Sequence, residues 1–335
     1  MMANTAGPTR IQSFSIDGVP ATLSGSVVAL GNFDGLHRGH LALLEAAIAD
    51  ARRIGIRALV LTFEPHPRDL FRPDTPVFRL TSPEAKLRLL SAIGIDAVVV
   101  IPFDQAFAAL TAEQFVAQVL VGRLSAGVVA VGYNFHFGHG RTGSASFLVE
   151  AGARFGFPVS IIGPIAGKDG VPYSATRIRD ALEAGDVAEA NKMLGYRWFV
   201  TATVISGDRR GRELGFPTAN LRLAGDCRLR HGIYAVRVGR ADGGVFDGVA
   251  SFGRRPTFDN GAPLLEACLF DFAGDLYGEE LTVTFIDWIR PELRFESVDA
   301  LVARMTEDAA AARRILAEAG PGNALDQALS VLGRP

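Results

Sequence analysis

Cysteine is scarce in this chain, and long apolar runs are absent. The only two cysteines, Cys227 and Cys268, belong to no CxxC pair, which argues against a disulfide framework and favours reducing surroundings. No apolar run reaches the roughly 18 residues that a membrane helix needs. The N-terminal stretch MMANTAGPTRIQSFSIDG has no basic segment followed by an apolar core, so no signal peptide is predicted. We therefore expect a cytoplasmic protein without a membrane partner.

An excess of one charge sign is also missing. The 335 residues include 34 Lys and Arg against 36 Asp and Glu, a formal net charge of −2. Nucleic-acid-binding proteins are usually basic, so no nucleic-acid partner is expected. Any polyanion must be held locally by a few placed groups. The 48% hydrophobic and 21% charged composition is that of an ordinary globular protein, long enough for two domains.

The first half of the chain alternates between two patterns. Short apolar runs predict strands at 26–30, 58–63, 97–103, 128–131 and 159–162, and helical periodicity fills 40–54, 83–93, 112–124 and 144–155. Most of the runs are continuously apolar, as in strands buried on both faces. This alternation predicts an α/β doubly wound parallel sheet, whose ligands bind at the carboxyl ends of the strands.

A different pattern follows residue 195. The segments FVTATVISG, GIYAVRVG, FDGVASFG, LLEACLFDF and ELTVTFIDWI read as short strands separated by Gly, Pro and Asp. They predict an antiparallel barrel or sandwich. A short helix at 174–183 and a helical connection at 183–195 precede it. A helix with apolar positions Leu301, Met305 and Leu316 follows, and the tail from residue 320 remains unplaced.

The stretch GNFDGLHRGH comes directly after the first of the predicted parallel strands. Gly31 and Gly35 allow a sharp turn and a close approach of the backbone to a ligand. The helix that begins near Gly39 offers free N–H groups and a positive dipole end, which suit an anion. His37 and His40 lie in its first turn and can donate hydrogen bonds to phosphate oxygens as charge builds up during transfer. A zinc site would need a third ligand or an i, i+4 pair.

The stretch GDRRGRELGFPTANL predicts a second phosphate site. Gly207, Gly211 and Gly215 can form a loop whose backbone amides surround phosphates, although P-loop spacing is absent. Thr218 and Asn220 share one face if this segment is extended. Both side chains offer oxygen ligands, which suit Mg²⁺.

Nine segments, in order along residues 25–317, resemble one family. They are GNFDGLHRGH, LTFEPHP, VGYNFHFGHGRTG, YSATRIRDAL, GFPTAN, HGIYAV, GVASFGRRPTF, LLEACLFDFAGDLYG and IRPELRFES. Together they are similar to the motifs of the prokaryotic bifunctional riboflavin kinase/FMN adenylyltransferase (FAD synthetase) family. The resemblance implies a nucleotidylyltransferase-like Rossmann variant at 1–185, a linker at 186–197, a riboflavin kinase β-barrel with a C-terminal helix at 198–319, and a tail at 320–335.

The resemblance also implies site residues. The catalytic groups are His37, His40 and Glu266, and the Mg²⁺ ligands are Thr218 and Asn220. Phosphates of ATP are assigned to Gly31, Asn32, Phe33, Asp34, Gly35, Gly39, Asn134, Ser174, Thr176 and Arg179 in the first domain and to Gly207, Gly211 and Gly215 in the second. The flavin is assigned to Phe71, Phe115 and Phe137.

The resemblance implies two ATP-dependent reactions, riboflavin to FMN in the C-terminal domain and FMN to FAD with pyrophosphate release in the N-terminal domain. Glu266 would be the general base that takes the proton of the riboflavin hydroxyl. Three alternatives remain open. Ala175 stands where relatives commonly have a second Ser, so the kinase could be the only working domain. The others are a flavin-binding regulator without catalysis and a nucleotidylyltransferase fused to an RNA-binding barrel.

Overall fold

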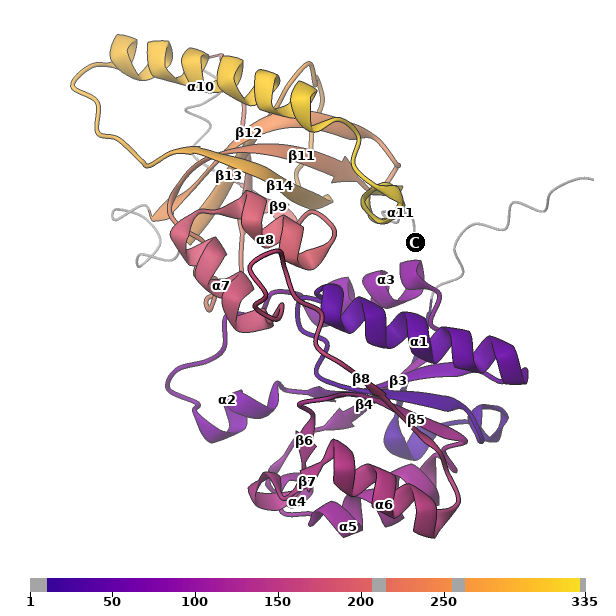
Figure 1. Ribbon diagram of the computed structural model, residues 1–335. Coiled ribbons are helices and arrows are strands. Elements are labelled where there is room, and N and C mark those ends of the chain that lie inside the picture. The colour runs from indigo at the N-terminus through magenta and orange to yellow at the C-terminus, as the bar shows by residue number, and fades with distance from the viewer. Residues whose placement is uncertain (1–10, 207–214, 255–262, 332–335) are drawn as a thin grey trace, which may run out of the picture. The chain divides into compact units, whose positions relative to one another are not determined.

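The computed structural model describes residues 11–206, 215–254 and 263–331, which form two compact units (Figure 1). Unit 1 is Met1–Val77 with Lys86–Ser174, and unit 2 is Phe78–Ala85 with Ala175–Pro335. Unit 2 is therefore discontinuous in sequence. The domain boundaries that the sequence predicts after residues 185, 197 and 319 stay predictions.

Unit 1 is built on the predicted parallel sheet. In spatial order its strands are β1 (Gln12–Ser15), β4 (Ala97–Pro102), β3 (Ala58–Glu64), β2 (Val27–Leu30), β5 (Val128–Gly132) and β8 (Val159–Ile162). All neighbouring pairs among them are parallel. This confirms the predicted fold class of the first half, and it adds β1, a short and mostly exposed strand that the sequence did not indicate.

Helices cover both faces of this sheet, which explains why its strands are continuously apolar. Helix α1 (Arg38–Ile54) packs against β2, β5 and β8. On the opposite side, α5 (Ala112–Gln114), η3 (Phe115–Arg123) and α6 (Ala145–Phe155) meet the sheet in one apolar cluster (Figure 1). The helix expected at 112–124 has π-type hydrogen bonding over η3, and this buries Phe115, Val116, Val119 and Leu120 together. The connections carry α2 (Pro67–Phe71), α3 (Pro83–Ile93), α4 (Gln105–Ala108), β6 (His136–Phe137) and β7 (Gly143–Ser144).

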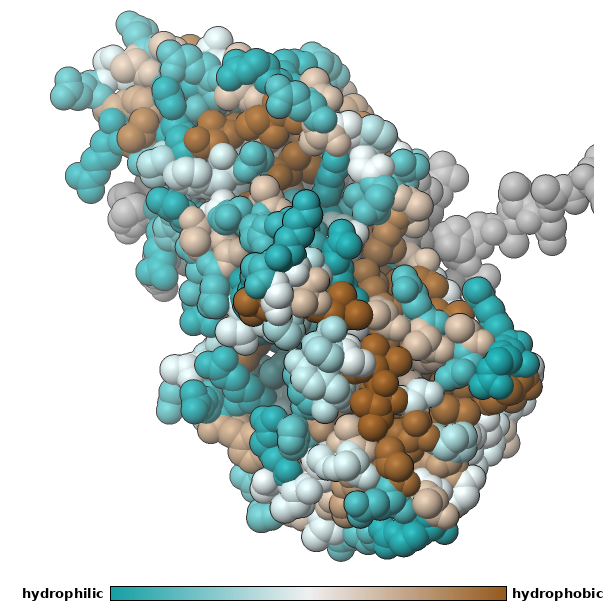
Figure 2. All heavy atoms as spheres, in the orientation of Figure 1, coloured by the Kyte–Doolittle hydropathy of each residue, from teal (hydrophilic) through white to brown (hydrophobic). Residues whose placement is uncertain are grey.

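Apolar side chains reach the surface of unit 1 at its edge. Strand β8 ends the strand order, and Ile161 on it is 43% exposed. Figure 2 shows an apolar strip where this edge strand runs. Among the described residues, no helix combines the length and the apolar character that crossing a membrane requires.

Unit 2 is a closed antiparallel barrel, which decides between the barrel and the sandwich. Its strands follow one another in the order β10 (Ala219–Arg222), β13 (Pro263–Leu269), β12 (Val245–Arg254), β11 (Gly232–Arg240), β14 (Glu280–Arg290) and β9 (Phe199–Ile205). Around the barrel lie α7 (Ala175–Ala184), α8 (Val187–Leu194), α10 (Val298–Ala319) and α11 (Ala324–Val331). Within the tail that the sequence left unplaced, Ala324–Val331 form α11, and Oδ1 of Asp326 accepts a hydrogen bond from the backbone N–H of Arg197 at 2.7 Å.

A segment from the N-terminal third of the chain completes unit 2. The carbonyl of Phe78 accepts a hydrogen bond from Nε of Arg179 at 2.7 Å, and the carbonyl of Leu80 accepts one from Nε1 of Trp198 at 2.8 Å. The ring of Phe78 also meets Trp198 edge-on. Residues 78–85 thus supply hydrogen-bond acceptors to two buried donors of unit 2, which favours the packing of this segment in that unit.

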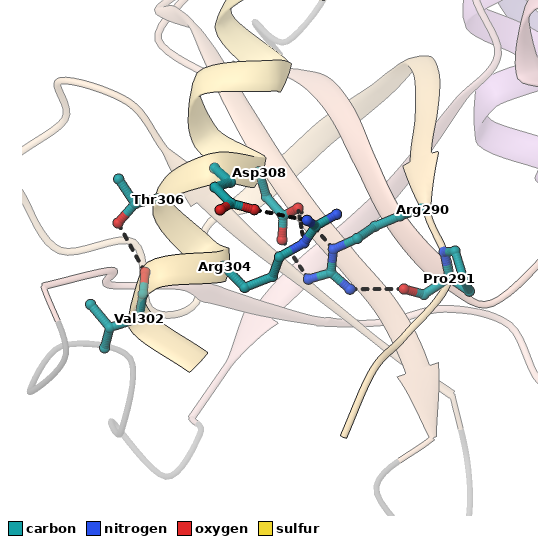
Figure 3. Close-up of polar contacts among 7 residues, drawn as sticks. Arg290, Pro291, Val302, Arg304, Thr306 and Asp308 are labelled. Carbon is teal, nitrogen blue, oxygen red and sulfur yellow. Dashed lines mark hydrogen bonds and ion pairs between the residues drawn. The ribbon is translucent and has the colours of Figure 1, made fainter. Parts of the chain in front are cut away.

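Helix α10 is anchored to the barrel by a buried ion pair (Figure 3). Nε of Arg290 donates to Oδ1 of Asp308 at 2.8 Å, and its Nη1 donates to the carbonyl of Pro291 at 2.8 Å. Nε of Arg304 lies 3.5 Å from Oδ1 of Asp308. Asp308 is only 4% exposed, so its carboxylate needs these cations. The apolar pattern of this helix gave no sign of the pair.

Both cysteines are free thiols. Burial raises the pKa of Cys227 to about 11 and also raises the pKa of Cys268. Neither thiol is therefore activated as a nucleophile at neutral pH.

Candidate active sites

The turn at the carboxyl end of β2 forms the first candidate site. It runs from Gly31 to His37, and α1 begins at Arg38. Gly35 has φ of 72°, which favours glycine. At Gly39 a Cβ would lie 3.1 Å from Cε1 and Nδ1 of His37, so a side chain there would crowd the imidazole. The glycines therefore make room for the histidine at the helix start.

His37 caps α1 through its ring. Nδ1 of His37 accepts a hydrogen bond from the backbone N–H of Gly39 at 3.2 Å. Because Nδ1 is the acceptor, the proton of the neutral ring is on Nε2, which is then a donor. The cap thus fixes the tautomer that can donate to a phosphate oxygen.

His40 stacks on His37. Their ring centroids are 3.8 Å apart with an interplanar angle of 23°, and Phe33 meets His40 edge-on at 5.3 Å. Nδ1 of His40 is buried and has no hydrogen-bond partner among the described residues. An unpaired buried polar atom is costly in an unliganded protein. Its presence beside a helix N-terminus fits a site that awaits an anionic ligand.

Burial keeps both imidazoles neutral. It lowers the pKa of His37 to about 4, although Asp34 acts in the opposite direction. Burial also lowers the pKa of His40 well below its ordinary value, and the proximity of His37 and Lys86 lowers it further. At pH 7 the turn therefore presents two neutral rings that hydrogen-bond without carrying charge.

Acid should destabilise the protein through His37. A depressed pKa means that the unfolded state takes up the proton first, so the stabilisation is complete above pH 6.5 and is lost as the pH falls toward 4. The loss amounts to about 3 kcal/mol. We expect the stability difference between wild type and His37→Asn to shrink by this amount between pH 7 and pH 4 in urea unfolding. Circular dichroism is the suitable signal because both tryptophans, Trp198 and Trp288, lie in unit 2. A difference that is constant with pH would contradict this prediction.

Lys86 is a residue of this region that the sequence analysis missed. Its Nζ lies 2.9 Å from Oε1 of Glu64 and 3.5 Å from Oγ1 of Thr62, and Lys86 is 4% exposed. Oγ1 of Thr62 donates to the carbonyl of Asn32 in the turn at 3.1 Å. A signal was available, because Lys86 shares the i, i+3, i+4 stripe of its helix with the buried Leu89 and Leu90.

Asn134 is placed at the same edge of the sheet as the turn. It follows β5, which pairs with β2, and it is exposed. Ser174 belongs to unit 1, whereas Thr176 and Arg179 belong to unit 2. Arg179 is buried and donates to the carbonyl of Phe78. Phosphate binding by Asn134, Ser174, Thr176 and Arg179 stays a prediction.

The three predicted flavin-binding phenylalanines differ in exposure. Phe71, on α2, is 68% exposed and meets the ring of Phe103 edge-on. Phe115 and Phe137 are buried in the apolar cluster of unit 1, with their ring centroids 5.0 Å apart. Phe71 is therefore the one of the three that offers a ring to a ligand in this conformation. Flavin binding stays a prediction for all three.

Three neighbouring strands of the barrel bring Asn220, Glu266 and Ser251 side by side in one row. Asn220 on β10 pairs with Glu266 on β13, and Glu266 pairs with Ser251 on β12. Directly paired residues project to the same face of a sheet. Their chain neighbours Ala219, Ala267 and Ala250 are buried on the other face. Asn220 and Glu266, which lie far apart in sequence, thus become neighbours.

Asn220 carries the most informative atom of this row. The residue is 6% exposed, and its Oδ1 is buried with no hydrogen-bond partner among the described residues. An amide oxygen in that state fits a hard cation such as Mg²⁺. Thr218 lies two residues earlier, is half-buried and precedes β10. Within the described ranges, no three His, Cys, Asp or Glu side chains converge on a metal position.

The glycine loop of the second site is only partly described. Gly215 is exposed and has φ of 81°. Gly207 and Gly211 lie outside the described residues. The structure thus combines an imidazole turn on a parallel sheet with an amide and carboxylate row on a barrel. This combination is typical of a transferase of phosphate-containing groups.

Comparisons with known proteins identify the family. A model of FAD synthetase matches residues 19–177, and a model of riboflavin kinase matches residues 194–316. The bifunctional riboflavin kinase/FMN adenylyltransferase of Escherichia coli K12 is 40% identical over 88% of this chain and 93% of its own length. The enzyme of the same name from Pseudomonas fluorescens is 40% identical over 88% of this chain and 94% of its own. The chain belongs to the bifunctional riboflavin kinase/FMN adenylyltransferase family, as the motifs predicted.

A solved structure shows the same fold. A Streptococcus pneumoniae protein named as a macrolide-efflux protein has 33% identity and a TM-score of 0.80, covering 90% of this chain and 99% of its own. The likeness therefore extends over both units. The predicted fold class, an α/β parallel sheet followed by a β-barrel with a C-terminal helix, is confirmed.

Proposed function

We propose that this chain makes FMN and FAD at two separate sites that its two units provide. The chain is a riboflavin kinase and an FMN adenylyltransferase, and its substrates are riboflavin, FMN and ATP. The observation that carries this function is the match of both family models, in order, on one chain. The assignment of individual residues to the two reactions is our proposal.

In the kinase reaction Glu266 acts as the general base. It takes the proton of the primary hydroxyl of riboflavin, the hydroxyl oxygen forms a bond to the γ-phosphorus of ATP, and ADP leaves. The placement of Glu266 beside Asn220 supports this role, because the base and the cation ligand then face the same substrates. Gly207, Gly211 and Gly215 would contribute backbone amides to the phosphates.

Mg²⁺ at Thr218 and Asn220 would neutralise charge on the phosphates of ATP. The unpaired Oδ1 of Asn220 supports this assignment. Asn220→Ala should raise the Mg²⁺ concentration for half-maximal FMN formation by about 10-fold or more. The test is a Mg²⁺ titration of riboflavin phosphorylation. Asn220→Asp keeps an oxygen ligand and should reach half-maximal FMN formation at about the wild-type Mg²⁺ concentration. An unchanged Mg²⁺ titration in Asn220→Ala would exclude the ligand role of Asn220.

In the adenylyl transfer the phosphate of FMN is itself the nucleophile. Its oxygen forms a bond to the α-phosphorus of ATP, and pyrophosphate leaves, so no covalent enzyme intermediate is needed. His37 and His40 donate hydrogen bonds to the phosphates, aided by the N–H groups at the start of α1. The neutral state of both rings and the unpaired Nδ1 of His40 support this role.

Product analysis tests the two-site proposal. The full chain is incubated with riboflavin, ATP and Mg²⁺, and the flavins are separated by chromatography over time. We expect FMN first and FAD later. Accumulation of FMN alone would mean that the adenylyltransferase site, which has Ala175 in its Ser-Ala-Thr segment, does not work. A cytoplasmic location remains part of this proposal, which the two free thiols favour.

A further inference from the structure

Lys86 is a buried cation next to the imidazole turn. Its side chain is 5% exposed, compared with 22% for its partner Glu64, and the two charged atoms are 2.9 Å apart. A buried ammonium costs free energy unless it is paired and hydrogen-bonded. The chain contains few lysines, and the other described ion pair of a lysine, Lys192 with Glu189, is largely exposed. The burial of Lys86 is therefore a feature that needs an explanation.

The contacts of Lys86 lead to the turn. Its ammonium contacts Thr62 and Glu64 at the carboxyl end of β3, the strand that pairs with β2. Thr62 donates to the carbonyl of Asn32, one residue after the glycine that opens the turn. The network thus joins a fixed positive charge to the backbone that positions the two histidines. The side chain of Lys86 is too deeply buried to contribute to solubility or to the charge of the surface.

The substrates of the proposed reaction are negatively charged, which bears on a cation in this region. Adenylyl transfer joins a phosphate monoester to a nucleoside triphosphate, and negative charge grows on the leaving pyrophosphate. The two imidazoles are neutral at pH 7. The buried ammonium of Lys86, paired with Glu64, lies close enough to His40 to oppose protonation of that ring.

We propose that Lys86 is a positioning residue of adenylyl transfer, whose ammonium fixes Thr62 and Glu64 so that the turn presents His37 and His40 as neutral donors to phosphate. The inference rests on the proposed function of the turn. Asp34 acts electrostatically on His37 and Lys86 acts on His40, and Glu64 is the ion-pair partner of Lys86. Removing the ammonium loosens the carbonyl of Asn32 and eases protonation of His40.

Three variants of the full chain test the proposal. Lys86→Met should lower kcat for FAD formation from FMN by about 10- to 100-fold with a smaller change in KM for ATP. Its acid limb in the pH profile should move to higher pH, because the charge that opposes protonation of His40 is gone. Lys86→Arg keeps the charge and should retain the wild-type acid limb and most of the rate. Lys192→Met, the same substitution at an exposed pair, should behave as wild type.

Two further measurements separate the possible failures. If Lys86→Met unfolds, the double variant Lys86→Met with Glu64→Gln removes the stranded carboxylate and should still show the shifted acid limb. An unmoved acid limb in the folded variants, or equal losses in the Met and Arg variants, would overturn the positioning role. The variant His37→Ala distinguishes the two proposals. If His37→Ala loses FAD formation while Lys86→Met keeps the wild-type rate and pH profile, only the role of Lys86 is overturned. If His37→Ala keeps FAD formation, the proposed function of the turn is overturned.

Discussion

His37→Ala should lower the rate of FAD formation from FMN by about 10²- to 10³-fold and leave FMN formation from riboflavin within about 2-fold. The ring is stacked on His40, capped onto Gly39 and held neutral with its donor on Nε2. In the proposed reaction, removing the ring deletes one hydrogen-bond donor to the phosphates. The measurement is the initial rate of each reaction, started separately from riboflavin and from FMN.

Loss of the helix cap must be separated from loss of the donor. His37→Ala also removes the side chain that accepts from the N–H of Gly39, which costs about 1 kcal/mol of stability. Asparagine is a good N-cap residue, so His37→Asn retains the cap and lacks the imidazole. We expect both variants to lose FAD formation alike. A wild-type rate in His37→Asn would show that the ring acts only through the helix start.

Glu266→Gln should have the opposite effect. It removes the proton acceptor with almost no change of shape, so riboflavin phosphorylation should fall by about 10²- to 10⁴-fold while conversion of added FMN to FAD continues. Glu266 pairs directly with Asn220 and Ser251, so the amide keeps its place in the row. The rate of FMN formation with saturating ATP and Mg²⁺ is the measurement.

A matched control lies on the same barrel. Glu280→Gln makes the same chemical change at the exposed start of β14 and should leave both reactions unchanged. If Glu266→Gln phosphorylates riboflavin at the wild-type rate, Glu266 is not the base. If it loses both reactions equally, the two sites are not independent, and the division of labour between the units fails.

The parts of the fold that could be predicted are those that a local pattern of apolar residues and glycines indicates. The apolar run 26–30 and the glycines after it predicted a buried strand and a tight turn. In the structure β2 ends at Leu30, directly before that turn. Short strands such as β1, with the polar sequence QSFS, carry no such pattern because their pairing with β4 alone defines them.

The candidate sites were predictable in residue type and less so in arrangement. The proximity of Asn220 and Glu266 depends on the register between β10 and β13, which no local pattern encodes. Likewise, the stacking of His37 on His40 could be anticipated from their spacing in one helical turn, whereas Lys86 reaches the same region only because α3 returns against β3. Long-range pairings set these positions.

The discontinuity of unit 2 has a consequence for the order of events at the ribosome. The acceptors Phe78 and Leu80 emerge 101 and 118 residues before Arg179 and Trp198, the donors that they will meet. These two acceptors of unit 2 are therefore synthesised before any of its barrel strands. A gene fragment that starts at codon 175 would encode a barrel whose Arg179 Nε and Trp198 Nε1 have lost these two acceptors. Keeping both hydrogen bonds in a divided gene would mean carrying residues 78–85 with the C-terminal half.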